Sequence, residues 1–187
     1  FYSDGTCDNC LKGVPTQCRS YAKYNLSGTR ADGDDHFQEN GKHISDMFNQ
    51  SSFTTTTVVD QRNAVKVDKN LDLRKLGPLG CGYVTGSGTV LNTLKPKPGD
   101  TIAVFGTGAV GLAAMMAGRI SGCIKVIAVD IVPERLELAK ELGATHTINS
   151  KEEDAVAKIK ELTNGYGVDW TIDTTGLPAV IKNGVDA

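Results

Sequence analysis

The residues from 106 to 111 have the spacing G-x-G-x-x-G, which is typical of a turn that binds the phosphates of a dinucleotide. Gly106 permits a tight turn after a strand, Gly108 leaves room for a pyrophosphate, and Gly111 lets the next helix pack closely. The phosphates would lie over backbone N–H groups at the positive end of that helix. The complete motif comprises Gly106, Thr107, Gly108, Ala109, Val110 and Gly111.

A carboxylate follows the glycine-rich turn at about the separation that a nucleotide site requires. Apolar runs at residues 102–105 and 126–129 are typical of buried strands, and Asp130 ends the second run. An aspartate there can accept hydrogen bonds from an adenosine ribose but would repel a 2′-phosphate. The order of strand, glycines, helix, strand and acid therefore predicts binding of NAD rather than NADP. The alternative is a tight strand-to-helix turn that binds no ligand.

Three of the five cysteines gather near the start of the chain in the pattern D-x2-C-x2-C-x7-C, which comprises Asp4, Cys7, Cys10 and Cys18. Three thiolates and one carboxylate can complete a tetrahedral zinc site, since zinc accepts both sulfur and oxygen ligands. A metal would also cross-link a loop that has little core of its own. The alternatives are three free thiols or a redox pair formed by Cys7 and Cys10. A fold of the NAD-binding type points to a reducing compartment, which favours metal binding over disulfides.

The composition is that of an ordinary globular protein, with 40% hydrophobic residues, 22% charged residues and a formal net charge of −2. This charge gives no reason to expect binding to nucleic acid or to a membrane surface. No apolar run is long enough to span a membrane and no signal peptide is recognisable, so we expect a cytoplasmic protein. Because the chain does not begin with Met and has no closing signal, we interpret it as a piece of a longer protein.

The elements that must position these residues fall into two parts. Residues 1–76 are loop-like at first and then β-rich, with two short strands expected over residues 53–67. His36 and His43 are expected to be solvated loop histidines. Residues 77–187 alternate strands and helices, which predicts an α/β fold with a parallel sheet.

Helix boundaries in the second part can be predicted from capping residues. Pro133 suits the first turn of one helix, and Gly143 suits the position after its last turn. Ser150 has capping-box spacing and is expected to start the following helix. Cys123 is expected to be a core residue.

Three segments together resemble the zinc-dependent medium-chain alcohol dehydrogenases: the cysteine cluster, GPLGCGYVTGSG at residues 77–88, and GTGAVG at residues 106–111. The segments HISDMFNQSSF and LGCGYVTGSGTVLN are most similar to aryl-alcohol (benzyl-alcohol) dehydrogenases. The resemblance extends over nearly the whole chain, which would form the middle half of such a protein. It implies a partial β-rich, GroES-like catalytic domain with a structural zinc lobe in residues 1–76. Residues 77–187 would then hold a linking helix and the first half of a Rossmann NAD-binding sheet.

The resemblance implies roles for individual residues. Cys7, Cys10 and Cys18 match the zinc lobe, where Asp4 stands in place of a fourth cysteine, and Cys81 matches a ligand of the catalytic zinc. A plain buried thiol is the alternative for Cys81. The residues implied at the cofactor are Thr85 and Val110 near the nicotinamide, Gly106, Thr107, Gly108, Ala109 and Gly111 at the pyrophosphate, Asp130, Ile131 and Arg135 around the adenosine, and Thr174 and Thr175 at the next strand end. The residues implied in the substrate pocket are Met47 and Phe48.

The activity implied by the resemblance is NAD-dependent oxidation of a primary, aryl alcohol to the aldehyde at a catalytic zinc, by a homodimer or homotetramer of a longer chain. The family's other two catalytic zinc ligands and its proton-relay residues would precede Phe1, so residues 1–187 alone are expected to be inactive. The competing interpretation is a truncated, inactive fragment that binds zinc and a dinucleotide. A zinc-free quinone reductase relative is disfavoured, because such proteins lack the cysteine cluster and the context of Cys81.

Overall fold

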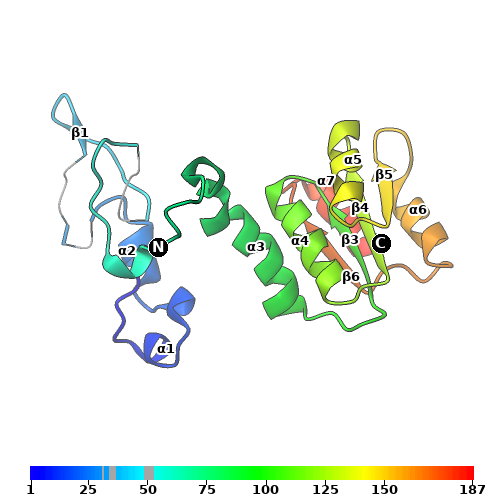
Figure 1. Cartoon of the computed structure of the whole chain (residues 1–187), viewed down its shortest axis with the longest axis horizontal. Helices are drawn as coiled ribbons and strands as arrows, with labels where there is room; N and C mark the ends of the chain where they lie inside the picture. Colours follow the sequence, from blue (N-terminus) through cyan, green and yellow to red (C-terminus); the bar gives the residue numbers. More distant parts are fainter. Residues whose placement is uncertain (31, 34–36, 49–52) are drawn as a thin grey trace. The chain divides into compact units, whose positions relative to one another are not determined.

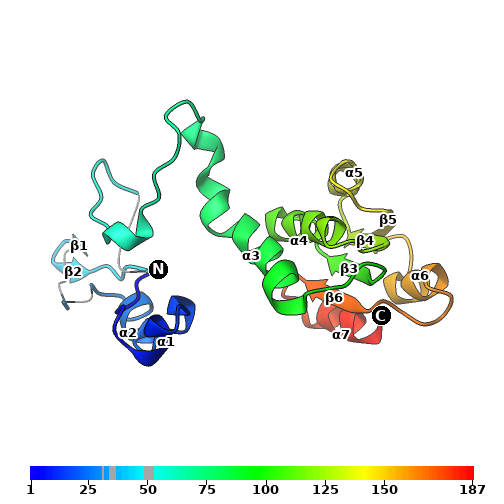
Figure 2. The same cartoon turned by 60° about the horizontal axis from the view of Figure 1, so that its bottom comes forward.

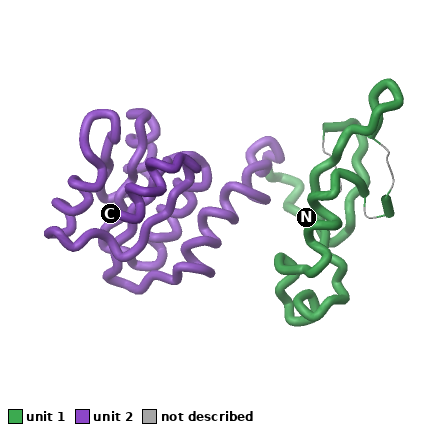
Figure 3. Tube along the Cα trace, turned by 180° about the vertical axis from the view of Figure 1, so that it is seen from behind, with its two compact units in different colours: residues 1–71 green, residues 72–187 purple. Residues whose placement is uncertain are grey.

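The computed structural model describes residues 1–30, 32–33, 37–48 and 53–187. The chain divides into two compact units, Phe1–Leu71 and Asp72–Ala187, which Figure 3 draws in different colours. The predicted domain boundary, after residue 76, falls slightly further along the chain than this division. His36 lies outside the described residues. In the part of the chain that is described, no helix is both long enough and apolar enough to cross a membrane.

Unit 1, residues 1–71, consists of short elements joined by irregular segments. Its elements are α1 (Asp8–Leu11), the 3-10 helix η1 (Pro15–Gln17), α2 (Tyr21–Asn25), the antiparallel pair β1 (Gln38–Glu39) and β2 (Lys42–His43), and the 3-10 helix η2 (Gln61–Asn63). The prediction of two strands over residues 53–67 is wrong, because these residues form a bent segment, irregular stretches and η2. Their side chains are exposed apart from the half-buried Asp60. Although Thr and Val are frequent in residues 53–67, this segment buries no apolar face that could hold a strand in register.

Unit 2, residues 72–187, is an α/β domain around a four-stranded parallel sheet, which confirms the predicted fold class (Figure 1). The sheet has the order β5-β4-β3-β6, and all of its pairs are parallel. The strands are β3 (Thr101–Phe105), β4 (Lys125–Asp130), β5 (His146–Asn149) and β6 (Trp170–Asp173). The helices are η3 (Leu73–Lys75), η4 (Gly77–Gly80), α3 (Gly82–Gly88), the π-helical η5 (Thr89–Leu94), α4 (Ala109–Ile120), α5 (Pro133–Glu141), α6 (Ala155–Leu162) and α7 (Pro178–Asp186).

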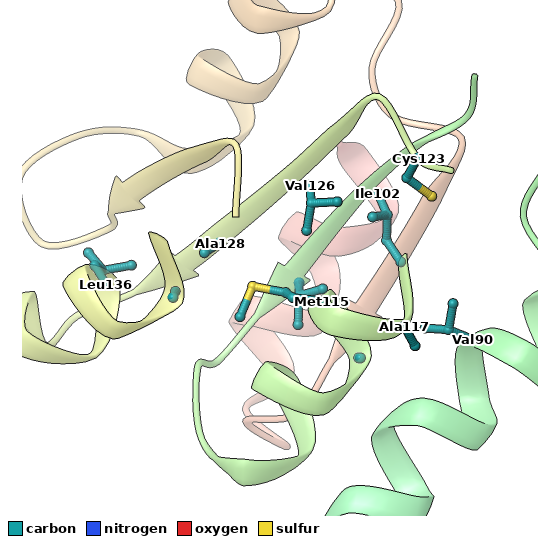
Figure 4. Close-up of a cluster of buried hydrophobic side chains, with 11 residues drawn as sticks. Val90, Ile102, Met115, Ala117, Cys123, Val126, Ala128 and Leu136 are labelled. Atoms are coloured by element: carbon teal, nitrogen blue, oxygen red, sulfur yellow. The ribbon is translucent and has the colours of Figure 1, made fainter. Parts of the chain in front are cut away.

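The alternation of side chains along β3 divides the core of unit 2 into two layers. Ile102 and Val104 face a cluster that includes residues of α4 and α5, and Cys123 lies in this cluster with 2% exposure, as predicted (Figure 4). Ala103 and Phe105 face the opposite cluster, which α6 and α7 cover (Figure 2). Because both faces are covered, the residues of β3 from Ile102 to Phe105 are almost completely buried.

The observed helix starts show where local sequence signals compete. Helix α5 begins at Pro133 and is followed by Gly143 with a φ of 112°, as predicted. Helix α6 begins at Ala155, so the predicted start at Ser150 is wrong. The cap is the Asp154 side chain, which accepts hydrogen bonds from the N–H groups of the second and third helical residues, Val156 and Ala157.

Candidate functional site

A pocket of about 420 Å³ opens at the carboxyl ends of β3, β4 and β6. The neighbours of β3 in the sheet are β4 on one side and β6 on the other, so the chain reverses its direction of progress here. In open parallel sheets this is the position at which ligands bind. Most of the residues predicted to contact NAD line this pocket, namely Gly106, Gly108, Ala109, Val110, Asp130, Ile131, Arg135, Thr174 and Thr175.

The three glycines of the turn meet three different steric conditions. Gly106 has a φ of 92°, which allows the chain to turn sharply after β3. A Cβ atom at Gly111 would lie 1.9 Å from the Gly106 carbonyl oxygen, so only glycine lets α4 start this close to the turn. A Cβ atom at Gly108 would meet nothing within 4 Å, because this residue faces the open pocket. The turn therefore offers backbone atoms and space on the side where a ligand would lie.

The N-terminus of α4 points its backbone donors at the same pocket. Gly108 is the N-cap residue, and no side chain in the described chain caps this helix. Ala109 and Val110, the first helical residues, both line the pocket. Since the first N–H groups of a helix have no intrahelical partner, this end of α4 is suited to binding an anion such as a pyrophosphate.

The Asp130 carboxylate fastens the glycine-rich turn to the end of β4. Its Oδ2 accepts hydrogen bonds from the Thr107 N–H and the Thr107 hydroxyl, both at 2.7 Å. Its Oδ1 accepts from the N–H groups of Ile131 at 2.7 Å and Val132 at 3.0 Å. Asp130 is 7% exposed and Thr107 is 1% exposed, so Thr107 lies beneath the pocket rather than in its lining.

Two opposing effects act on the ionisation of Asp130. Burial by itself would raise the pKa of this carboxyl. The hydrogen bonds from Thr107, Ile131 and Val132 stabilise the charged form and together hold the pKa below its ordinary value. A negative charge therefore stays at the rim of the pocket at neutral pH.

The end of β6 closes the other side of the turn. The Thr174 hydroxyl donates to the carbonyl oxygens of Phe105 at 3.0 Å and Gly106 at 3.1 Å. The Thr175 hydroxyl donates to Asp173 Oδ1 at 2.7 Å. These bonds hold the two threonines in place beside the glycine-rich turn.

Helix α3 packs against the start of α4 through two glycines. A Cβ atom at Gly86 would lie 2.0 Å from the Val110 carbonyl oxygen, and one at Gly82 would lie 3.3 Å from the Ala109 Cβ. Cys81, at the N-cap of α3, and Thr85, one turn later, are both exposed and lie outside the pocket lining. Close packing of α3 thus fixes these two residues on a helix that contacts the glycine-rich turn.

Several residues of the pocket lining were not predicted from the sequence. They are Phe105, Val129, Ser150, Ala155, Leu177, Val180 and Asn183. Phe105 is the last residue of β3 and Val129 is the last but one of β4, so their positions could have been inferred from the strand pattern. The others come from α6, α7 and the loops before these helices, and only tertiary packing brings them to the pocket.

The four predicted zinc ligands of unit 1 come together in the structure. One ligand atom from each of Asp4, Cys7, Cys10 and Cys18 lies within 4.8 Å of all the others. Tetrahedral zinc with sulfur ligands places the ligand atoms about 3.8 Å apart, so a slight contraction would complete the site. Asp4 Oδ1 also accepts hydrogen bonds from the N–H groups of Thr6 at 2.8 Å and Cys7 at 2.9 Å, which fixes this side chain at the cluster.

The cysteines of the cluster differ in their ionisation. Backbone N–H groups of Arg19 and Cys10 lower the pKa of Cys7. Partial burial and the neighbouring Cys7 thiol raise the pKa of Cys10 to about 12, because a second thiolate is unfavourable beside the first. A divalent cation between them would remove this repulsion, which is the chemistry expected of a metal-binding set.

The residues predicted for the substrate pocket belong to unit 1. Met47 is exposed, and Phe48 is half-buried with a φ of 59°. This left-handed conformation is unusual for an aromatic residue, and such strained positions are often found at functional sites. A role for Met47 and Phe48 in substrate binding stays a prediction.

Comparisons with known proteins identify relatives along the whole chain. Residues 109–187 match the family described as zinc-binding dehydrogenase. The chain is 43% identical to a geraniol dehydrogenase of Castellaniella defragrans, over 99% of this chain and 50% of that protein. An alcohol dehydrogenase zinc-binding domain protein from Burkholderia ambifaria has a similar crystal structure, with a TM-score of 0.88 and 48% identity over 100% of this chain and 51% of that one. Benzyl alcohol dehydrogenase from Acinetobacter calcoaceticus matches with a TM-score of 0.87 and 44% identity, over 100% of this chain and 50% of that one. The chain thus spans about half the length of these relatives.

Proposed function

Because this chain is a relative of the zinc-binding alcohol dehydrogenases, we propose that it forms the cofactor-binding and zinc-bearing part of an enzyme that oxidises a primary, aryl alcohol with NAD. The observation that carries the proposal is the pocket over the glycine-rich turn, where the uncapped start of α4 and the Asp130 carboxylate lie on the same cavity. An apolar alcohol is consistent with the named relatives, which include geraniol and benzyl alcohol dehydrogenases.

Residues of this chain would hold the cofactor in three ways. The N–H groups of Ala109 and Val110 would bind the pyrophosphate, since they lie at the start of α4 and on the pocket. The charge of Asp130 would favour a ribose with free hydroxyls over one that carries a 2′-phosphate. Ile131, which is 48% exposed, and Arg135 would border the adenosine from the loop and helix after β4.

The proposed reaction requires the cofactor, a catalytic zinc and the alcohol at one site. When bound, NAD would supply the hydride acceptor, and a catalytic zinc would supply the Lewis acid that favours release of the hydroxyl proton to solvent. Cys81 would supply one ligand to that zinc, and Thr85, one turn later on α3, would position the nicotinamide. The packing of Gly82 and Gly86 against α4 supports this assignment, because it keeps α3 beside the glycine-rich turn. As in other such enzymes, we expect the full-length protein to be a homodimer or homotetramer.

The cysteine cluster of unit 1 would bind a structural zinc. Its four ligand atoms already lie close together, and Asp4 would be the single oxygen ligand among three thiolates. A purified protein that contains much less than a stoichiometric amount of zinc, with no chelator used, would count against this site.

A second candidate function is a non-catalytic zinc- and dinucleotide-binding protein. The observation that favours it is that Cys81 lies outside the cluster of Asp4, Cys7, Cys10 and Cys18, which is the only group of three or more candidate metal ligands in residues 1–30, 32–33, 37–48 and 53–187. One cysteine cannot hold a catalytic zinc. Turnover of an alcohol by the purified protein separates the two candidates.

The decisive variant is Gly108→Val. A Cβ atom at this position would meet no protein atom within 4 Å, and the residue lines the pocket, so a valine should block the pyrophosphate without disturbing the fold. Gly77→Val is the matched control, because a Cβ atom there also meets nothing within 4 Å and the residue lies outside the pocket lining.

NADH binding, followed by the fluorescence of the reduced nicotinamide, is expected for the unaltered protein and for Gly77→Val and is expected to be lost in Gly108→Val. Equal binding by all three proteins, or none by the unaltered protein, would refute this pocket as the cofactor site. Benzyl alcohol and ethanol then serve as substrates with NAD. A kcat/KM for ethanol at least about tenfold above that for benzyl alcohol would exclude an aryl alcohol as the preferred substrate. An apolar pocket separates two alcohols of such different size by about tenfold or more.

A further inference from the structure

Hydrogen-bond donors of the protein surround the Asp130 carboxylate. They leave its oxygen atoms little capacity to accept a further hydrogen bond from a ligand. An ionised carboxylate offers about four lone-pair positions. Four donors already occupy them: the N–H and hydroxyl of Thr107, and the N–H groups of Ile131 and Val132. A ribose hydroxyl that donates to Asp130 must therefore share an oxygen atom with one of these groups.

Three of the four donors are backbone groups whose positions follow from the fold. The N–H groups of Ile131 and Val132 belong to the chain directly after Asp130, and the Thr107 N–H belongs to the glycine-rich turn. The Thr107 hydroxyl is the only side-chain donor among them. It can rotate about its Cβ–Oγ bond, and its oxygen can accept as well as donate. It is thus the one donor that a substitution can remove while the three backbone donors remain.

The burial of Thr107 indicates that this hydroxyl acts on Asp130 rather than on a cofactor directly. Thr107 is 1% exposed and is absent from the pocket lining, whereas Asp130 borders the pocket. A valine at position 107 has nearly the same shape but would place a methyl group where the oxygen now lies, 2.7 Å from Asp130 Oδ2. Because a methyl carbon and an oxygen atom cannot stay that close, the carboxylate would be displaced.

We propose that Thr107 is a positioning residue that sets the cofactor preference of this site, because its hydroxyl orients the Asp130 carboxylate toward the adenosine ribose. The inference rests on the proposed function, in which Asp130 faces that ribose. The preference for NADH over NADPH arises from two effects of Asp130. One is a hydrogen bond to the ribose, which depends on orientation, and the other is repulsion of a 2′-phosphate, which depends on orientation much less.

The proposal predicts unequal effects on the two cofactors. In Thr107→Val, NADH loses its acceptor, and its Kd rises about tenfold, the expected size for loss of a hydrogen bond to a charged group. The Kd of NADPH, which does not use this bond, stays nearly constant, so the ratio of the two Kd values falls about tenfold. Thr107→Ser retains the hydroxyl and is expected to keep the original ratio.

Strand β3 provides a matched control at its other end. The N–H and hydroxyl of Thr101 both donate to Asp169 Oδ2 at 2.8 Å, which repeats the arrangement of Thr107 and Asp130 outside the pocket. Thr101→Val therefore removes the same type of bond and is expected to leave both Kd values unchanged. Thr107→Ala provides a second test of the hydroxyl should the valine variant fail to fold, and the same loss of preference is expected.

The experiment is titration of the purified protein and these variants with NADH and with NADPH, together with the thermal unfolding midpoint of each. If Thr107→Val only loosens the glycine-rich turn, the binding of NADH and of NADPH would weaken equally, because both contain the pyrophosphate. That result would overturn the proposal. Unchanged affinity for both cofactors in Thr107→Val would also overturn it. An unaltered protein with no preference for NADH refutes the proposed cofactor together with this inference, whereas a preference that persists in Thr107→Val refutes the inference alone.

Discussion

Replacement of Gly86 by alanine tests the packing that holds α3 against α4. In a helix this change normally stabilises by about 0.8–1 kcal/mol, because alanine loses less backbone entropy. Here the added Cβ atom would lie 2.0 Å from the Val110 carbonyl oxygen and 2.9 Å from the Ala114 nitrogen, so the two helices must separate. Overpacking of a close contact costs about 1–3 kcal/mol. We therefore expect Gly86→Ala to have a lower free energy of unfolding than the unaltered protein.

Gly88→Ala is the matched control on the same helix. Its Cβ atom would approach only the Asn92 side chain, at 3.8 Å, which is an ordinary contact. Both variants have the same intrinsic gain in helix propensity, so the difference between them isolates the steric cost of about 1–3 kcal/mol. Gly88→Ala itself is expected to be slightly more stable than the unaltered protein.

Urea unfolding measures this difference directly. Trp170 is the only tryptophan of the sequence and lies on β6 in unit 2, so its fluorescence reports the unfolding of the unit that contains α3. If the proposed function holds, Gly86→Ala in the full-length protein is expected to slow alcohol turnover, because α3 contains Thr85 and Cys81 is its N-cap. Equal stability of the two variants would show that α3 and α4 are not in close contact, and the reasoning would then be refuted.

Three further predictions follow from single side chains. Asp4→Cys replaces the oxygen ligand of the zinc cluster by a thiolate, and we expect zinc to be retained at chelator concentrations that strip the unaltered protein, as measured by zinc analysis after dialysis. Asp130→Asn should destabilise the protein most at neutral pH. Folding lowers the pKa of Asp130 from 3.8, so its stabilisation is present above that value and is lost as the pH falls through the folded pKa; urea titrations at decreasing pH should show the difference shrinking. Asp154→Ala removes the cap of α6 and should cost about 1 kcal/mol, whereas Ser150→Ala should change the stability by less than about 0.5 kcal/mol; a larger effect at Ser150 would contradict the observed helix start.

Local sequence patterns predicted the second unit well because its key features are set by residues close together in the chain. The glycine-rich turn, the strand before it and Asp130 all lie within one strand-helix-strand segment, and the pocket formed there as expected. The predicted resemblance to alcohol dehydrogenases is confirmed by relatives that match along the whole chain. The two hydrogen bonds from Thr107 to Asp130 could not be predicted, because they depend on the contact between two segments 23 residues apart.

Prediction failed where a local preference needs a distant partner. Residues 53–67 are rich in Thr and Val, yet a strand forms only when a neighbouring strand and a buried face complete it. The prediction of where α6 starts failed for a different reason. Asp154 competes with Ser150 as the cap, and its side chain accepts hydrogen bonds from two N–H groups of the first turn. Leu177, Val180 and Asn183 reach the pocket through the packing of α7, which no short motif records.

The central position of β3 has a consequence for the dynamics of the cofactor site. Its residues from Ile102 to Phe105 are at most 1% exposed, and it is hydrogen-bonded to a parallel strand on each side. Amide hydrogens in such a strand exchange with solvent only through the rarest openings of the structure. The glycine-rich turn thus begins at the part of unit 2 that should exchange most slowly in deuterium oxide. Entry and release of a cofactor should then proceed by motion of the loops around the pocket, while the strand that bears the turn stays closed.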